Sequence, residues 1–446
     1  MKHADKNKPF PSKPLSARAV ALSVLIQVIH KHTPLDQTLE QALLDHHLDS
    51  RDRAFTRNLV FLVMRRLGAL KHVLGQIVNK PIANEAARTK TAVLMGIAQV
   101  LFLRTSDHAA VSESVDLIGN APHPKERGMK GLVNALLRRV VRERDHWLAE
   151  IDSRPEADIA GPFRRRYSDA FGAEEAKSLG MTLRAEPPLD ITLKPGEDIT
   201  AWAEKLEAKP IGNHTLRREF TDVTALDGFE GGHWWVQDIA ATLPAQLLPS
   251  DVSGKTVLDM CAAPGGKTMQ LAAMGANVIA LDRSRKRLDR LQQNLDRTHL
   301  TAEVVTADGT NFKPETKIDH ILLDAPCSAT GTFRRNPDVL WSRSKADIDK
   351  LAALQAKLLD HAFTLLPVGG VMIYCVCSLE SEEGVDQVSA FLSRTDAAAR
   401  LPISSESVGS LPVMITDEGD VLTRPTMMAD QGGMDGFTIS RLTRTA

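Results

Sequence analysis

Two short cysteine-containing segments in the second half of the chain could carry nucleophilic chemistry. One is DAPCS at 324–328 and the other is CVCS at 375–378, and each follows an apolar run. A thiolate is a strong nucleophile, although a single cysteine is more often a small buried hydrophobic residue. Because Cys327 and Cys377 stand beyond two neighbouring apolar runs, we expect both to be reactive. The residues alone leave open which of the two attacks a substrate.

A glycine turn and two acidic residues indicate a site for a nucleotide-like cofactor. The turn, CAAPGGKT at 261–268, follows an apolar run that contains Asp259, and Asp282 comes 23 residues after Asp259. Glycines let the backbone approach a ligand at the start of a helix, and an acid at this distance suits ribose hydroxyls. A phosphate-binding loop needs a glycine where Cys261 stands, and the G-x-G-x-x-G fingerprint is absent. The pattern therefore favours an adenosine-bearing cofactor over a nucleoside triphosphate.

Strands and helices alternate from about residue 254 onward, so a sheet is expected to position these residues. Asp259, Asp282, Asp308 and Asp324 end or follow four of the five expected strands, and the fifth runs into Cys375. A single aspartate at such a place is commonly a helix N-cap. In a doubly wound parallel sheet, however, ligands bind beyond the carboxyl ends of the strands, so we expect these residues to gather at one edge. The expected strands are 256–258, 278–281, 302–306, 320–323 and 371–374, and the expected helices are 269–274, 285–297, 345–366 and 382–392.

The first part of the chain has the pattern of a helical bundle. Between residues 16 and 144, apolar residues recur at helical spacing with prolines between the runs, which predicts roughly six helices. A small α+β connector should follow, with a strand at 189–193 and a helix at 200–206. The expected boundaries are a disordered basic tail at 1–14, the helical domain at 15–145, the connector at 146–235 and the α/β domain at 236–446.

The composition is that of an ordinary globular protein, with 43% hydrophobic and 25% charged residues among 446. No window approaches the roughly 18 apolar residues of a membrane span, and four cysteines are too few for a disulfide framework, so a cytoplasmic location is expected. Residues 1–150 hold 23 basic against 14 acidic residues, and the remainder holds 32 against 42. This asymmetry fits either a polyanionic partner or a helical domain that is merely basic.

The glycine turn and the cysteine segments resemble the RNA cytosine-5 methyltransferases that use S-adenosylmethionine. The helical front half is similar to a NusB-type RNA-binding domain, and this pairing is typical of the RsmB/Sun group, which modifies 16S ribosomal RNA. The resemblance implies a Rossmann-like α/β methyltransferase domain, an all-α NusB-like bundle and an RRM-like connector. The similar blocks are 257–268, 323–331, 334–338 and 374–378, with further matches at 236–238 and 435–437.

The resemblance assigns roles to both thiols. It implies that Cys377 attacks C6 of cytosine so that C5 can accept the methyl group, that Cys327 assists the elimination step, and that Asp324 bonds the N3 edge. In DNA-type enzymes the Pro-Cys loop attacks instead, and that would be Cys327 here. The resemblance also implies that S-adenosylmethionine is held by Cys261, Ala262, Ala263, Pro264, Gly265, Gly266, Lys267, Asp282, Arg287, Asp308 and Asp324.

Basic residues mark the expected contacts with RNA. Arg334 and Arg335 follow the Pro-Cys segment and suit phosphates beside a flipped base, although a solvated loop would look the same. Arg138 and Arg139 lie at the basic end of the helical domain. We expect a monomer that acts on 16S rRNA, naked or in an early particle, with no metal and no membrane. The alternatives are a tRNA cytosine-5 methyltransferase and a non-catalytic RNA-binding assembly factor.

Overall fold

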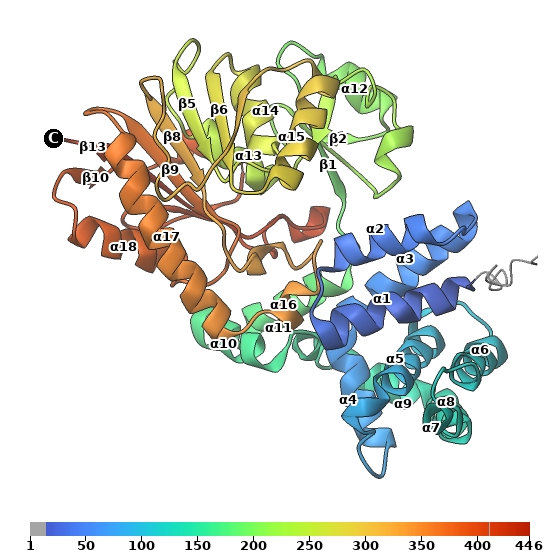
Figure 1. The fold of residues 1–446 in the computed structure, drawn as a ribbon. Coiled ribbons are helices and arrows are strands. Elements are labelled where there is room, and N and C mark those ends of the chain that lie inside the picture. Colours follow the sequence, from blue (N-terminus) through green and yellow to red (C-terminus); the bar gives the residue numbers. More distant parts are fainter. Residues whose placement is uncertain (1–14, 410) are drawn as a thin grey trace, which may run out of the picture. The chain divides into compact units, whose positions relative to one another are not determined.

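The computed structural model describes residues 15–409 and 411–446, so the basic tail expected at 1–14 lies outside the described residues. The chain divides into two compact units. The first holds the chain up to Arg184 together with Asn336–Ser342, and the second holds Ala185–Arg335 and Arg343–Ala446. Each unit is described by itself below, with the elements labelled in Figure 1.

The first unit is a bundle of helices, as the periodicity predicted. Its longest helices bury their apolar faces together, so that Leu22, Leu59 and Leu94 have no exposed surface. Ser16 and Asp49 cap the first and third helices with their side chains, the local signal that starts a helix. The helices are α1 (Ala17–Lys31), α2 (Leu35–Asp45), α3 (Ser50–Arg65), α4 (Leu67–Ile77), α5 (Ala87–Phe102), α6 (Asp107–Gly119), α7 (Pro124–Arg127), α8 (Lys130–Arg142), α9 (Arg144–Asp152), α10 (Gly161–Phe171), α11 (Ala173–Arg184) and α16 (Val339–Ser342).

The first unit extends to Arg184, whereas the sequence predicts a boundary at 145. The reason is a buried carboxylate, Asp158, which has no exposed surface. It accepts a hydrogen bond from the Ala69 backbone at 3.1 Å and pairs with Arg184 at 2.7 Å and Arg66 at 3.4 Å. A buried charge is tolerated when it is paired and hydrogen-bonded. These bonds attach the segment that contains α9, α10 and α11 to the earlier helices.

A short segment at 336–342 also belongs to the first unit, although it interrupts the second unit along the chain. The Asp338 carboxylate accepts a hydrogen bond from the Leu35 backbone at 3.1 Å, at the start of α2. The Lys71 ammonium lies over the Trp341 ring at 3.9 Å from its centre. These contacts fix the segment on the bundle through a helix end and a cation–π pair.

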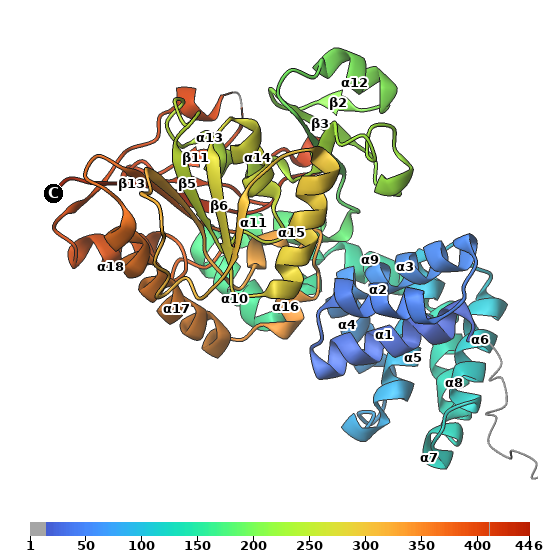
Figure 2. The ribbon, with the colours of Figure 1, turned by 45° about the horizontal axis from the view of Figure 1, so that its top comes forward.

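The second unit contains a small antiparallel sheet, the α+β connector expected after the helices. Its strand order is β2-β3-β1-β4, and helix α12 packs on it through Trp202 against Ile191 and Leu216. Figure 2 shows this sheet with α12 beside it. The elements are β1 (Leu189–Leu193), α12 (Ile199–Lys205), β2 (Lys209–Pro210), β3 (Thr215–Arg218) and β4 (Trp234–Val236).

The larger sheet of the second unit is doubly wound, which confirms the expected α/β class. Strands β9-β8-β5-β6-β7 are parallel neighbours, and the antiparallel strands β13, β12 and β11 continue beyond β9, with β10 on β13. The order of the chain reverses between β5 and β8, which is where ligands bind in such sheets. The strands are β5 (Thr256–Met260), β6 (Asn277–Asp282), β7 (Glu303–Thr306), β8 (His320–Asp324), β9 (Val371–Val376), β10 (Ala398–Arg400), β11 (Met414–Ile415), β12 (Val421–Leu422) and β13 (Thr438–Arg444).

Helices cover both faces of the larger sheet. Alternate residues of a strand point to opposite faces, so Val257 packs with α13 and α14 while Leu258 packs with α17 and α18. Figure 1 shows α13, α14 and α15 separated from α17 and α18 by the strands. No helix within 15–409 and 411–446 is long and apolar enough to cross a membrane. The helices are α13 (Ile239–Gln246), α14 (Gly266–Ala273), α15 (Arg285–Thr298), α17 (Lys345–Leu365) and α18 (Val385–Ser393).

Candidate active site

The two reactive-cysteine candidates lie side by side at the carboxyl ends of β8 and β9. The Sγ atoms of Cys327 and Cys377 are 3.5 Å apart, and both residues are half-buried. The hydrogen bond to Cys377, with burial adding to it, raises the pKa of Cys327 well above its usual value. Cys327 therefore holds its proton, and it can share that proton with the sulfur of Cys377.

Backbone bonds hold the two cysteine loops against each other. The Gly331 backbone donates to the Cys377 carbonyl at 3.0 Å, and the Ala325 backbone donates to the Cys375 carbonyl at 2.9 Å. Cys375 is fully buried at the end of β9, and burial raises the pKa of its thiol. Cys375 is therefore packed at the end of the strand and holds its proton.

Asp324 connects the thiol pair with the glycine turn. Its carboxylate accepts a hydrogen bond from Lys267 Nζ at 2.8 Å, and it also contacts the Cys375 thiol at 3.5 Å. Burial alone lowers the pKa of Lys267, but the nearby Asp324 outweighs it and the pKa lies above its usual value. Lys267 is therefore a fixed cation, and it lies 5.1 Å from the centre of the Phe437 ring.

The glycine turn between β5 and α14 has a backbone that side chains would obstruct. Gly265 has a φ of 107°, in the left-handed region, and a Cβ there would stand 2.8 Å from Leu291. Cys261, at the start of the turn, also has a positive φ of 63°. Burial raises the pKa of Cys261 to about 12, so this cysteine stays a neutral thiol that lines the turn.

Asp282 ends β6 beside the turn and is 3% exposed. Its carboxylate accepts hydrogen bonds from the Ser284 backbone at 2.8 Å and the Ala263 backbone at 3.4 Å, and it pairs with Arg287 at 3.2 Å. Arg287 also donates to the Ala263 carbonyl. The structure thus brings together three residues that the resemblance assigned to the cofactor.

Asp308 lies beyond β7, where its carboxylate caps its own turn. It accepts hydrogen bonds from the backbone and the hydroxyl of Thr310 at 2.9 and 2.7 Å. These two bonds lower the pKa of Asp308. The carboxylate is therefore ionised and oriented at the same edge of the sheet as the other three aspartates.

Asp259 lies under the turn with no exposed surface. Its Oδ2 accepts a hydrogen bond from Thr268 at 2.6 Å, while its buried Oδ1 has no hydrogen-bond partner. Burial raises the pKa of Asp259 to about 7. A glycine cradle, an unpartnered buried oxygen and the Asp282 carboxylate are groups that fit an adenosine-bearing cofactor.

The structure places Arg334 inside the second unit, contrary to the phosphate contact that we expected. Arg334 is 1% exposed, and its guanidinium bonds Asp238 at 2.7 Å, Asp435 at 3.2 Å and the Gly432 carbonyl at 2.7 Å. The two buried carboxylates attract this cation into the fold because an unpaired buried charge is costly. Arg335 also pairs with Asp435, but 43% of its side chain is exposed.

The other two expected RNA contacts lie on α8 of the first unit. Arg138 is exposed and donates to Asn134 at 3.0 Å. Arg139 pairs with Glu143 at 3.0 Å and lines a hollow of about 740 Å³ between α8 and residues 77–83. Lys80 and Arg142 also line this basic hollow, whose other lining residues are mostly apolar and include no acidic side chain.

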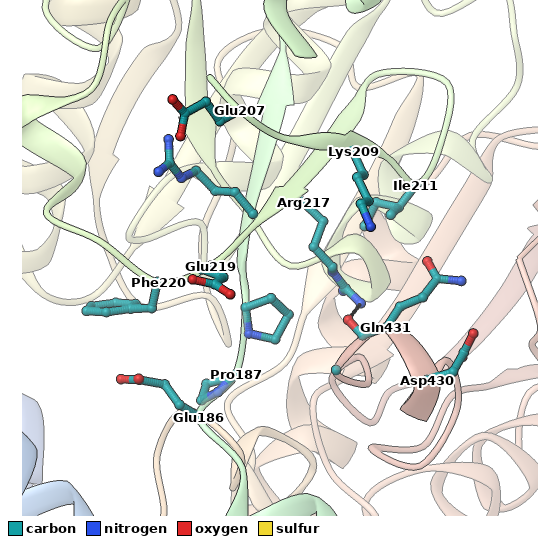
Figure 3. Close-up of a pocket in the computed structure, with 13 residues that line it drawn as sticks. Glu186, Pro187, Glu207, Lys209, Ile211, Arg217, Glu219, Phe220, Asp430 and Gln431 are labelled. Carbon is teal, nitrogen blue, oxygen red and sulfur yellow. Dashed lines mark hydrogen bonds between the residues drawn. The ribbon is translucent and has the colours of Figure 1, made fainter. Parts of the chain in front are cut away.

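A second hollow, of about 800 Å³, lies in the second unit and is shown in Figure 3. It is lined by both signs of charge, with Lys209, Arg217 and Arg218 among the basic residues and Glu186, Glu207 and Glu219 among the acidic ones. None of the residues that the sequence assigned to catalysis, cofactor or RNA lines it. The mixed charge does not suit a polyanion.

Three site residues were missed by the sequence reasoning. Asp238 and Asp435 stand within the matched blocks 236–238 and 435–437, so a signal for them existed. Glu383 had no such signal, yet its buried carboxylate bonds both cysteine loops. No group of three or more potential metal ligands occurs in the part of the chain that the structure describes.

The second unit is a Rossmann-like cofactor-binding domain with a thiol pair at its ligand edge. Three features define it: a parallel sheet whose strand order reverses between β5 and β8, the glycine turn, and the carboxylates at the strand ends. Residues 245–443 match the family described as 16S rRNA methyltransferase RsmB/F, and residues 15–142 match the NusB family. The chain belongs to the 16S rRNA methyltransferase RsmB/F family, and it is an S-adenosylmethionine-dependent methyltransferase.

Similar proteins extend over nearly the whole chain. The chain is 35% identical to ribosomal RNA small subunit methyltransferase B of Pseudomonas putida, over 97% of this chain and 99% of that protein. It is 34% identical to the protein of the same name from Cronobacter sakazakii, over 92% of this chain and 97% of the relative. The solved structure of PH0851 shares the fold, with a TM-score of 0.76 and 20% identity over 97% of this chain and 100% of that one.

Proposed function

We propose that the protein transfers a methyl group from S-adenosylmethionine to C5 of a specific cytosine in 16S rRNA, through a covalent bond between Cys377 and C6. The observation that carries this proposal is the pair of thiols 3.5 Å apart, beside the Lys267–Asp324 bond. The names of the relatives from Pseudomonas putida and Cronobacter sakazakii support the small-subunit rRNA as substrate. A cytoplasmic location and a monomeric state belong to the same proposal.

The chemistry requires a nucleophile because cytosine C5 is not reactive by itself. Cys377 Sγ bonds C6, and the electron pair of the C5–C6 double bond makes C5 nucleophilic while Asp324 bonds the N3 edge of the ring. S-adenosylmethionine, when bound, supplies an electrophilic methyl group. Transfer of the C5 proton to water acting as the base then expels Sγ as a thiolate and restores the aromatic ring, and the protonated Cys327 assists this elimination by donating a hydrogen bond to the departing sulfur. The raised pKa of Cys327 supports Cys377 as the nucleophile and Cys327 as the assisting thiol, because a protonated Cys327 can stabilise a thiolate at Cys377.

The cofactor would be held by the glycine turn and by the carboxylates around it. Cys261 to Lys267 would surround the methionine end, Asp282 the ribose and Asp308 the adenine. Arg287 would orient Asp282, to which it is bonded at 3.2 Å. Lys267 holds Asp324 in place between the turn and the thiols.

For RNA, we propose contacts through Arg335 near the thiols and through Arg138 and Arg139 on α8. The Arg335 side chain is 43% exposed, whereas the bonds of Arg334 to Asp238 and Asp435 suit it to holding the loop that carries Arg335. The basic hollow around Arg139 extends the proposed RNA surface of the first unit to Lys80 and Arg142.

The test is methyl transfer from labelled S-adenosylmethionine to unmethylated 16S rRNA, with tRNA as the parallel substrate. We expect label in 5-methylcytosine of the rRNA, complete loss with Cys377→Ala, and accumulation of a protein–RNA adduct with Cys327→Ala. Binding of labelled cofactor by each variant controls for folding.

Other outcomes would each contradict a separate part of the proposal. Adduct formation by Cys377→Ala would move the nucleophile to Cys327. Transfer to tRNA but not to rRNA would change the substrate. A wild-type protein that binds the cofactor and RNA without any transfer would support the assembly-factor alternative.

A further inference from the structure

One buried carboxylate bonds both cysteine loops. Glu383 lies just before α18 and has no exposed surface. Its side chain accepts hydrogen bonds from the Ser328 backbone at 2.8 Å, from the Ser378 hydroxyl at 2.6 Å and from the Ser328 hydroxyl. Each of these serines directly follows one of the paired thiols, Cys327 or Cys377. A single side chain thus connects the residues next to the two sulfur atoms.

A second buried side chain completes this arrangement from α17. Gln355 has no exposed surface, and its amide donates to Glu383 at 3.2 Å and to the Pro326 carbonyl at 2.9 Å. Cys327 is therefore held through the residue before it and the residue after it. The hydroxyls of Ser328 and Ser378 also lie 3.1 Å apart, so they share a proton network around the carboxylate.

Burial of a carboxylate is costly, and this one is stabilised by donors from the two cysteine loops and by the Gln355 amide of α17. If the carboxylate is lost, Ser328 and Ser378 lose their common acceptor and the loops lose their cross-link. The backbone bond from Gly331 to the Cys377 carbonyl would still join them, so the expected result is a displaced thiol pair rather than an unfolded domain.

We propose that Glu383 is a positioning residue that sets the separation of the Cys327 and Cys377 thiols through Ser328 and Ser378. It does not touch the reacting atoms. The proposal rests on the proposed function for the roles of the two thiols, but the separation itself can be measured without any methyl transfer. A thiol pair must be held within fractions of an ångström for one sulfur to bond C6 while the other assists elimination.

The first test measures the separation directly, by disulfide formation between Cys327 and Cys377 with diamide. The two thiols give up two electrons and two protons to diamide, which becomes the hydrazine, and peptide mass spectrometry identifies the linked pair. We expect fast closure in the wild type, several-fold slower closure in Glu383→Ala, and an intermediate rate in Glu383→Gln, which keeps one acceptor oxygen. Equal rates in all three folded proteins would overturn the proposal.

The matched control is Glu382→Gln, the same chemical change one residue earlier. Glu382 pairs at 3.5 Å with Lys345, the first residue of α17, whereas the partners of Glu383 include both cysteine loops. We expect wild-type disulfide closure from this variant. Slowing as large as that of Glu383→Gln would show a general effect of the turn and would contradict a specific role for Glu383.

The second test separates kcat from KM in the methyl-transfer assay. A 1 Å displacement of a reacting group can cost roughly 100-fold in rate, so we expect a loss of that order in kcat for Glu383→Ala with the KM for RNA and cofactor nearly unchanged. Partial recovery in Glu383→Gln is expected. A change confined to KM would overturn the positioning role. If the wild type transfers no methyl group, the proposed function fails while the disulfide rates still decide the role of Glu383.

Discussion

The thiol loops of the second unit and the basic hollow of the first unit are built in opposite ways. Around the thiols, buried groups such as Glu383 and Lys267 are bonded to specific partners inside the fold. Around the hollow, Lys80 and Arg142 are exposed, and most of the other lining residues are apolar. One region holds atoms at fixed distances, and the other presents charge to solvent.

The difference predicts which measurement responds to a change in each region. A fixed network controls geometry, so its loss should reduce kcat or stability. Exposed cations act through counterion release, so their loss should reduce RNA affinity and its dependence on salt. A variant in one region that changed both stability and the salt dependence of RNA affinity would contradict the comparison.

The largest effect is expected for Arg334→Met, which removes a cation from between two buried carboxylates. Asp238 and Asp435 would remain without this partner, and breaking such a buried pair costs about 3–5 kcal/mol. Arg335→Met is the matched control, because its side chain is half-exposed and Asp435 would keep Arg334 as a partner, so a smaller loss is expected. Urea unfolding of both variants measures the difference. Equal losses of unfolding free energy in the two variants would mean that the buried ion pairs of Arg334 contribute no more to stability than the half-exposed pair of Arg335.

Asp259 is expected to make the free energy of unfolding depend on pH. Burial raises its pKa to about 7 in the folded state, so the folded protein binds this proton more tightly than the unfolded chain does. Its contribution therefore favours folding at low pH and is lost as the pH rises from about 4 to 7, by at most roughly 4 kcal/mol. Asp259→Asn keeps a neutral group at every pH. Its stability relative to the wild type should rise between pH 5 and pH 8, and a constant difference would contradict the raised pKa.

Much of the site was predictable because strand ends are predictable. The apolar runs located the strands to within a few residues. Because parallel strands end at the same edge of a sheet, Asp282, Asp324 and Cys377 could then be expected at one edge. The helical class followed in the same way from spacing. The first compact unit continues past the expected boundary at 145 to Arg184, and the contact that attaches Arg184 is the buried charge of Asp158, which has no periodic signal in the sequence.

Whether a charged residue is paired or free could not be predicted in the same way. Arg334 and Arg335 are adjacent in the chain, yet one is 1% exposed and the side chain of the other is 43% exposed. Both arginines pair with Asp435, but Arg334 also bonds Asp238 and the Gly432 carbonyl, which lie far from it in sequence. Glu383 was missed for the same reason, since its donors come from loops about 5 and 55 residues earlier.

A moderate effect is expected from removing two cations of the basic hollow with Lys80→Gln and Arg142→Gln together. The loss of two phosphate contacts should lower rRNA affinity by about tenfold at moderate salt and reduce the salt slope by about 1.5. Cofactor affinity should not change. The control replaces Lys350 and Lys357, two exposed lysines of α17, by Gln. An equal loss of affinity in the control would mean that net charge, rather than the hollow, attracts the RNA.

The smallest effect is expected for Arg138→Gln, and it sharpens the comparison within a single helix. Arg138 is exposed and its bond to Asn134 is local, so the substitution should reduce the salt slope by about 0.7 and leave stability unchanged within about 0.5 kcal/mol. Its neighbour Arg139 also bonds Glu143 and the Ile77 carbonyl, so Arg139→Gln should lower the melting temperature as well as the RNA affinity. Filter binding at several salt concentrations and thermal unfolding separate the two responses. If Arg138→Gln destabilised the protein as much as Arg139→Gln, α8 would be one cooperative surface and the division between fixed and exposed charge would fail there.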